Sequence, residues 1–364
     1  MRTPVSIALL TIASVGCELG ETAIPDEPAI YLASVDEDTP SEQVAFAIES
    51  TGATQNRVYP AIHVVRLLAT PEQRALIEDF EFVNAVEPVN GIDGDDDDRS
   101  SLRAGAAELA AGQNLSWGVA AVGGPLPPTG RALWVLDSGI ELDHPDLNVD
   151  RQRSADMVVF LGGRESQDTR HGTGVAGVAA AIDNDFGTVG VTPGALVVSV
   201  RVLDDTGRGR MDTLIAGLNY AAERAAPGDV FNLSLAARGH SVVVTDAVTH
   251  VANKQISVVL AAGNAASDSA NFTPAGLSHT GVYTISAMDE SGCLASFSNY
   301  GAPIDAAAPG TNIVTLDPGG GSAVYEGTSF AAPHVAGLLL AGELSSQGNI
   351  CGDQDGVAEP IAHR

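Results

Sequence analysis

Three separated residues, Asp137, His171 and Ser329, could together perform nucleophilic catalysis. A serine hydroxyl attacks a carbonyl when a neutral imidazole accepts its proton, and a carboxylate can hold that imidazole in the required tautomer. Ser329 lies in the segment Gly-Thr-Ser-Phe-Ala-Ala-Pro-His at 327–334, just ahead of an apolar helical run. The free N–H groups and the dipole of a helix N-terminus would stabilise an oxyanion there. Taken alone, the segment is more typical of an N-cap on a buried helix.

The surroundings of the other candidates favour the catalytic interpretation. Asp137 ends the apolar run Leu-Trp-Val-Leu at 133–136, and His171 opens a stretch of small residues, His-Gly-Thr-Gly-Val-Ala-Gly. Asn264 follows another apolar run, in Ala-Ala-Gly-Asn, where its amide could donate to an oxyanion together with the backbone N–H of Ser329. The chain order acid, base, serine differs from the orders found in chymotrypsin-like enzymes and in α/β-hydrolases.

These segments make the chain resemble the subtilisin-like serine peptidases, in particular the proteinase K-like branch. Further matching segments are Asp-Ser-Gly-Ile at 137–140, His-Pro-Asp-Leu at 144–147, Asn-Leu-Ser-Leu at 232–235 and Phe-Ser-Asn-Tyr-Gly at 297–301. The resemblance spans residues 113–343. It implies a serine endopeptidase acting on polypeptides, with Asp137, His171 and Ser329 as the triad and Asn264 as the oxyanion donor. Gly174 stands where many relatives have His, a departure that concerns local packing and not the triad.

Two other functions are weighed against this one. The first is a catalytically silent binding or scaffold protein on the same fold. The second is a dinucleotide-binding enzyme, because Gly172, Gly174 and Gly177 have the spacing of the glycine fingerprint. That fingerprint needs a strand running straight into the first glycine, whereas residues 162–170 are polar. We therefore interpret these glycines as room for a small-residue helix near the site, and we interpret His334 and His144 as structural.

The resemblance also implies a substrate cleft and a metal site. The segments 207–210 and 234–237 correspond to the two that pair with substrate, so the expected contacts are Gly207, Arg208, Gly209, Ser234, Leu235, Ala236, Ala262 and Gly263. The alanines after Leu235 are expected to narrow the primary pocket. The arginines at 208, 210 and 238 either attract acidic substrate side chains or point into solvent. Asp305, with the carbonyls of Thr280 and Val282, matches a calcium site of the family, and such hard oxygen ligands suit Ca²⁺; an exposed aspartate is the alternative. No organic cofactor is expected.

Composition limits the partners. The chain has 364 residues and a formal net charge of −28, which argues against nucleic acid and anionic membranes. Residues 1–16 are predicted to be a signal peptide, because Arg2 precedes a short apolar run. The protein is then either secreted or anchored to a bacterial envelope by a lipid on Cys17, and it is expected to be a monomer. Cys293 and Cys351 either form a disulfide or remain thiols.

The remaining boundaries follow from the pattern along the chain. Residues 17–28 are a predicted linker, 93–112 an acidic and Ala-rich junction that contains the maturation site, 113–343 the catalytic domain and 344–364 a tail without predicted structure. Residues 29–92 have the order β-α-β-β-α-β of a ferredoxin-like unit. This unit is similar to the family's inhibitor-type propeptide, which would make it an intramolecular inhibitor. An unrelated small binding domain is the alternative.

Alternating strands and helices predict the fold class of the larger part. Apolar strands separated by helices indicate an α/β, doubly wound, mostly parallel sheet with helices on both faces. Helices are expected at 172–182, 212–224, 242–254 and 329–343. Strands are expected at 133–136, 157–161, 196–203, 230–235, 257–262, 283–287 and 304–307. Ligands of such sheets bind at the carboxyl ends of the strands.

Overall fold

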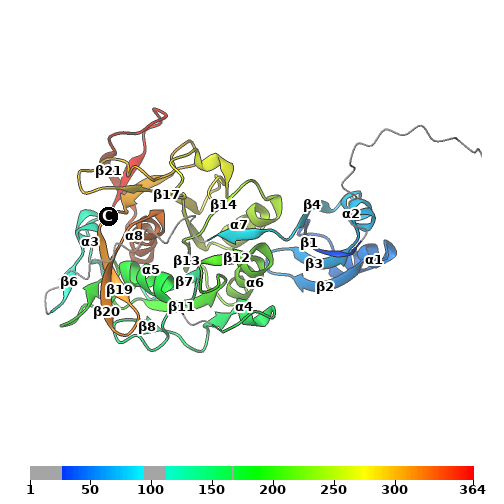
Figure 1. Ribbon diagram of the computed structural model, residues 1–364, viewed down its shortest axis with the longest axis horizontal. Coiled ribbons are helices and arrows are strands. Elements are labelled where there is room, and N and C mark those ends of the chain that lie inside the picture. The colour runs from blue at the N-terminus through cyan, green and yellow to red at the C-terminus, as the bar shows by residue number, and fades with distance from the viewer. Residues whose placement is uncertain (1–26, 94–111, 166–167) are drawn as a thin grey trace, which may run out of the picture.

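The computed structural model describes residues 27–93, 112–165 and 168–364. In Figure 1 a small unit, drawn in blue, lies to the right of a larger unit that holds the rest of the described chain. The predicted signal peptide, Cys17 and most of the linker and of the junction fall outside the described residues. No helix within the described ranges is long and apolar enough to cross a membrane.

The small unit has the predicted ferredoxin-like arrangement. Its antiparallel sheet has the order β2-β3-β1-β4 and carries two helices. Helix α2 begins after Thr70, whose hydroxyl accepts the N–H of Gln73 while the Gln73 side chain accepts the N–H of Thr70, so two unpaired donors are satisfied. The elements are β1 (Ala29–Val35), α1 (Ser41–Ser50), β2 (Thr54–Tyr59), β3 (Val64–Ala69), α2 (Pro71–Glu78) and β4 (Val83–Pro88).

The larger unit is built on one sheet with the strand order β21-β22-β18-β17-β15-β13-β7-β11-β8, and β9 also pairs with β11. All pairs are parallel except β21 with β22, which confirms the predicted doubly wound, mostly parallel sheet. The strands are β7 (Ala132–Asp137), β8 (Asn148–Val149), β9 (Ala155–Asp156), β11 (Leu196–Arg201), β13 (Val230–Leu233), β15 (Ser257–Ala261), β17 (Val282–Met288), β18 (Ala306–Pro309), β21 (Ser345–Asn349) and β22 (Pro360–His363).

Helices cover both faces of this sheet. Along β7, Leu133 and Val135 face a core shared with α5 and α8, while Trp134 and Leu136 face a second core shared with α6 and α7. This alternation follows from the two-residue period of a strand, and both faces are buried, so β7 reads as a continuous apolar run. The helices are α3 (Trp117–Ala121), α4 (Met157–Phe160), α5 (Arg170–Ala180), α6 (Met211–Ala222), α7 (Val242–Asn253) and α8 (Thr328–Ala341).

Short elements complete the larger unit. The strands β19 and β20 form an antiparallel hairpin. Three further two-stranded pairs lie outside the main sheet: β6 with β10, β5 with β12 and β14 with β16. These elements are β5 (Gly91–Asp93), β6 (Asn114–Leu115), β10 (Thr188–Val189), β12 (Arg208–Arg210), β14 (Ala237–Arg238), the 3₁₀ turn η1 (Ser269–Asn271), β16 (Phe272–Thr273), β19 (Ile313–Asp317) and β20 (Gly321–Tyr325).

One prediction about an element is wrong. The segment 157–161, predicted as a strand, forms helix α4 over Met157–Phe160, because the Asp156 side chain accepts the N–H of Val159 and caps a helical turn. In the tail at 344–364, for which no structure was predicted, β22 pairs in parallel with β18 and extends the main sheet. A disulfide between Cys293 and Cys351 joins the tail to the loop after β17, which settles the open alternative for these cysteines.

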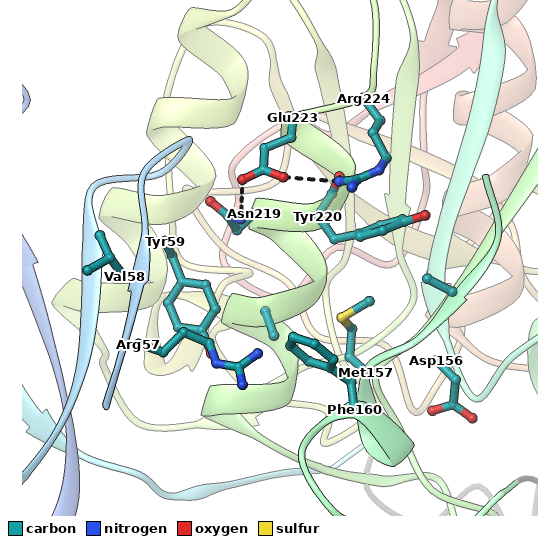
Figure 2. A pocket seen from close by; sticks show the side chains of 12 residues that line it. Arg57, Val58, Tyr59, Asp156, Met157, Phe160, Asn219, Tyr220, Glu223 and Arg224 are labelled. Atoms are coloured by element: carbon teal, nitrogen blue, oxygen red, sulfur yellow. Dashed lines mark hydrogen bonds and ion pairs between the residues drawn. The ribbon is translucent and has the colours of Figure 1, made fainter. Parts of the chain in front are cut away.

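The small unit packs against α6 and α7. Leu32, Tyr59 and Ile62 belong to the same buried cluster as the inner residues of these helices, and Arg66 forms an ion pair with buried Asp212 at 3.0 Å. A hollow of about 510 Å³ remains at this contact. Figure 2 shows Tyr59 on one side of it and Phe160 and Tyr220 on the other. Burial raises the pKa of Tyr59 to about 12. The contact is therefore extensive and partly apolar.

Candidate active site

The predicted acid and base are hydrogen-bonded. Asp137 ends β7 and is fully buried, and its Oδ1 lies 2.8 Å from Nδ1 of His171, the second residue of α5. The same oxygen accepts the N–H of Ser138 at 2.6 Å, and the Ser138 hydroxyl accepts the N–H of Gly172 at 3.3 Å. These bonds fix the carboxylate and the start of α5 together. They place the proton of a neutral imidazole on Nδ1 and its lone pair on Nε2.

The topology of the sheet explains why these groups meet at one edge. After β7 the chain adds β11 on one side of β7, and it then adds β13 on the other side. Strand order reverses at this point, and ligands of open α/β sheets bind beyond the carboxyl ends of the strands at such a switch point. Asp137 stands at the carboxyl end of β7, at this position. The predicted strand-end position of the acid is confirmed.

Ser329 is the second residue of α8, which packs against α5. The ring of the next residue, Phe330, contacts the His171 ring edge-on, with centroids 5.4 Å apart, so the nucleophile and base segments adjoin. Pro333 lies within α8 and has no N–H for the carbonyl of Ser329 four residues earlier. The Ser234 hydroxyl donates to this carbonyl instead, at 2.8 Å. The predicted substrate segment at 234–236 is therefore anchored beside the serine.

Asn264 lies at the N-terminus of the same helix. Its Oδ1 accepts both the N–H of Thr328, at 2.9 Å, and the Thr328 hydroxyl, at 3.1 Å. These two bonds assign the oxygen end of the amide to Thr328, so that Nδ2 is the donor end. A Cβ built on Gly327 would lie 3.2 Å from Nδ2, which places the donor beside the backbone that leads into Ser329. The arrangement has the parts of an oxyanion hole.

Asn299 holds the turn that carries Asn264, a role that sequence reasoning missed. Its Oδ1 accepts the N–H groups of Ala265 and Ser267, and its Nδ2 donates to the carbonyl of Ala262. Gly263 adopts φ +102°, and a Cβ there would lie 2.4 Å from Nδ2 of Asn299. Asn299 belongs to the segment Phe-Ser-Asn-Tyr-Gly that carries part of the family resemblance, but it lies 35 residues after Asn264, and no local pattern indicates this contact.

The glycines of α5 serve close packing, as predicted. A Cβ on Gly172 would lie 2.2 Å from the carbonyl oxygen of Gly139, and one on Gly177 would lie 2.5 Å from the Thr315 hydroxyl. No strand precedes Gly172 within 168–171, and α5 begins at Arg170. The dinucleotide interpretation therefore has no support in the geometry.

The other two histidines of the active-site region are structural. His334 is buried on α8, its Nδ1 bonds to the carbonyl of Phe330, and desolvation lowers its pKa to about 4. His144 is buried between Asp146 and the carbonyl of Asp317. Neither bonds to Asp137, whose histidine partner is His171.

The predicted substrate edge is paired with a strand of the chain itself. Strand β5, which follows the small unit, pairs antiparallel with β12, so that Ile92 faces Gly209 and Gly91 faces Arg210. A Cβ on Gly209 would lie 2.7 Å from the Leu203 side chain, which explains why a glycine stands there. Ile92 is 3% exposed and belongs to the same buried cluster as Leu203 and Leu235. An extended segment with an aliphatic side chain thus fits this edge.

The arginines near this edge have partners. Arg210 donates through Nε and Nη2 to the two oxygens of buried Asp212, at 2.9 and 3.1 Å, and Asp212 raises the pKa of Arg210. Arg238 lies over the ring of Phe272, 5.0 Å from its centroid. Both charges are engaged within the unit, which weakens the expectation that they attract acidic substrate side chains.

The residues expected to bind calcium lie at the start of two neighbouring strands. Asp305 precedes β18 and exchanges two bonds with Thr284: its Oδ2 accepts the N–H of Thr284, and its own N–H donates to the carbonyl of Thr284. Val282 begins β17, and Thr280 is in the loop before it. Asp305 is exposed as a residue, although partial burial raises the pKa of its carboxyl group. The donor set is carboxylate and carbonyl oxygen, which fits Ca²⁺.

Comparison with known proteins gives one family. Residues 129–342 match the subtilase family. The chain is 40% identical over 222 residues to "Thermophilic serine proteinase" of Bacillus sp. (strain AK1), covering 60% of this chain and 53% of that protein. It is 38% identical over 233 residues to "Subtilisin BL" of Lederbergia lenta, covering 62% and 82%. The chain thus spans about half the length of the first relative.

A solved structure gives the same result for the fold. The structure described as that of a cold adapted subtilisin-like serine proteinase superposes with a TM-score of 0.55 at 30% sequence identity. The match covers 64% of this chain and 88% of that one.

Proposed function

The chain belongs to the subtilase family, and we propose that it is a serine endopeptidase that hydrolyses peptide bonds through an acyl-enzyme on Ser329. The single observation that carries this proposal is the 2.8 Å bond between Asp137 and Nδ1 of His171, on a helix that packs against the helix of Ser329. A catalytically silent protein would have no need of this bond.

Each group then has one role in the reaction. Nε2 of His171 accepts the Ser329 proton as the hydroxyl attacks the scissile carbonyl, and it returns the proton to the leaving amine. Asp137 holds the imidazole tautomer and stabilises the imidazolium. The oxyanion receives hydrogen bonds from Nδ2 of Asn264 and from the backbone N–H of Ser329. Water then repeats the sequence on the acyl-enzyme and releases the acid product.

Residues 29–92 are proposed to be an inhibitory propeptide. The pairing of β5 with β12 supports this role, because residues 91–93 lie along the edge expected to pair with substrate. Two further contacts hold the unit in place: Glu87 accepts bonds from Ser241 and from the N–H of Val242 at the start of α7, and Ala61 donates to Asn219 on α6. Activation then requires cleavage in the junction at 93–112 and release of the small unit. Secretion and removal of residues 1–16 belong to the same proposal.

The substrates are proposed to be extended polypeptides. Strand pairing with β12 is tolerant of sequence, and the buried site of Ile92 favours an aliphatic side chain at the corresponding position. Calcium would be held by Asp305 and the carbonyls of Thr280 and Val282, where it would supply a structural cross-link between neighbouring strands.

A fluorophosphonate probe tests the function directly. The mature protein is expected to be labelled and to digest casein, and the Ser329→Ala variant is expected to lose both properties. His171→Ala should lose nearly as much activity as Ser329→Ala, because the two residues act as a unit. Purified Ser329→Ala protein that digested casein at the parent rate would overturn the assignment. N-terminal sequencing of the active product should begin between residues 93 and 113.

A further inference from the structure

Two histidines and a glutamate meet where the small unit contacts α7. Glu37 follows β1, His63 lies in the turn before β3, and His250 is on α7. One ligand atom from each lies within 4.8 Å of those of the other two. The two imidazole rings are 4.7 Å apart between centroids, and Nε2 of His250 is 3.8 Å from Oε2 of Glu37. The triad and the proposed calcium site use none of these residues.

The histidines are held in a form that can bind a metal. Nδ1 of His250 lies 2.8 Å from the carbonyl of Asp246, one helical turn earlier, so Nδ1 carries the proton and Nε2 presents its lone pair toward Glu37. His63 has a left-handed backbone conformation, with φ +52°, in the turn before β3.

The surroundings also suit a cation. Asp36, Glu37 and Asp38 line a depression of about 440 Å³ beside His250, which leaves room for water at a further coordination position. Lys254, at the end of α7, is a positive charge near His63, and it acts against the binding of a cation. Two imidazoles and one carboxylate form a ligand set used by zinc, with bonds of about 2.0–2.2 Å. Ligands at that distance lie roughly 3.4 Å apart in a tetrahedron, about 0.4 Å less than the 3.8 Å between His250 and Glu37, and the Glu37 side chain is exposed and can close this difference.

We propose that Glu37, His63 and His250 form a Zn²⁺ site that links the small unit to the catalytic unit and slows their separation. Two ligands come from the small unit and one from α7, so neither unit alone offers the full set. The regulatory part of this inference rests on the proposed role of the small unit as an inhibitor. Zinc would then delay activation, and a chelator would advance it.

Binding is tested on the full chain carrying Ser329→Ala, which cannot digest itself. Titration calorimetry with Zn²⁺ is expected to give one site per chain. His250→Ala and His63→Asn should each weaken binding roughly tenfold or more, and asparagine is chosen because it tolerates the left-handed backbone at 63. His363→Ala, in the C-terminal strand, is the matched control and should bind as the parent does. No saturable binding, or binding unchanged in His250→Ala, would overturn the site.

The bridge is tested by amide hydrogen exchange on the same protein. In the parent, Zn²⁺ should slow amide exchange in the turn around His63 roughly tenfold or more, a size typical of energetic coupling between two sites. In His250→Ala, Zn²⁺ should not slow this exchange. Equal slowing in both would show that zinc binds the small unit alone and would overturn the link. Neither measurement depends on peptidase activity. An inactive wild-type chain with zinc-dependent protection would therefore refute the proposed function and leave the bridge intact.

Discussion

Replacement of Asn264 separates its two roles in the site. The Asn264→Ala variant loses the Nδ2 donor and also the Oδ1 acceptor that satisfies the N–H and hydroxyl of Thr328. Loss of an oxyanion donor costs about 2.7–4 kcal/mol of transition-state stabilisation, or roughly 10²–10³ in kcat. Loss of the acceptor removes two hydrogen bonds from buried Thr328, at a cost of about 1–3 kcal/mol in unfolding free energy.

The Asn264→Asp variant is the matched comparison. It keeps an oxygen for Thr328, removes the donor, and is expected to lose at least as much kcat as the alanine variant, with little loss of stability. The assay is hydrolysis of a chromogenic peptide for kcat and KM, with urea unfolding in the Ser329→Ala background for stability. If Asn264→Asp kept kcat within roughly threefold of the parent while Asn264→Ala fell by 10²-fold or more, the alanine defect would be structural and the oxyanion role would be refuted.

Three further expectations concern stability, measured in the Ser329→Ala background. Burial raises the pKa of Glu359 to about 7 from 4.5, so the folded state binds the extra proton between these values. The free energy of unfolding should then fall by up to about 3 kcal/mol as pH rises from 4.5 to 7. The urea midpoint of Glu359→Gln should fall less over this range than that of the parent. An equal fall in both proteins would show that Glu359 does not cause the pH dependence. The disulfide closes a separation of 58 residues, and the double variant Cys293→Ser, Cys351→Ser should lose up to about 4 kcal/mol by the chain-entropy relation; an unchanged urea midpoint would argue against a role in stability. If Asp305 binds calcium, a chelator should lower Tm and added Ca²⁺ should restore it, whereas Asp305→Asn should respond to neither; an unresponsive parent would count against the site.

Local sequence was sufficient where one segment fixes its own structure. The capping box of Thr70 and Gln73 lies within one turn and defines the start of α2, and the apolar run before Asp137 predicted a buried strand with a carboxylate at its end. The apolar run at 157–161 was wrongly predicted as a strand, because so short a run does not distinguish the period of a helix from that of a strand. The contact that decided for a helix was the N-cap provided by Asp156. The tail was also missed. Its β21 is polar and exposed, and its place in the sheet depends on pairing through β22 with β18, a strand about 50 residues earlier.

The sequence by itself determined the order and identity of the groups that can react, because each of Asp137, His171, Asn264 and Ser329 has a local context that sets its strand end or helix start. Only the tertiary structure decided how these groups are held. The support of the Asn264 turn by Asn299, the use of Ser234 to satisfy the carbonyl freed by Pro333, and the pairing of β5 with β12 all join distant segments. Hydrogen bonds and packing between such segments depend on the path of the chain through the sheet, which no local pattern encodes. The cluster of Glu37, His63 and His250 exists for the same reason.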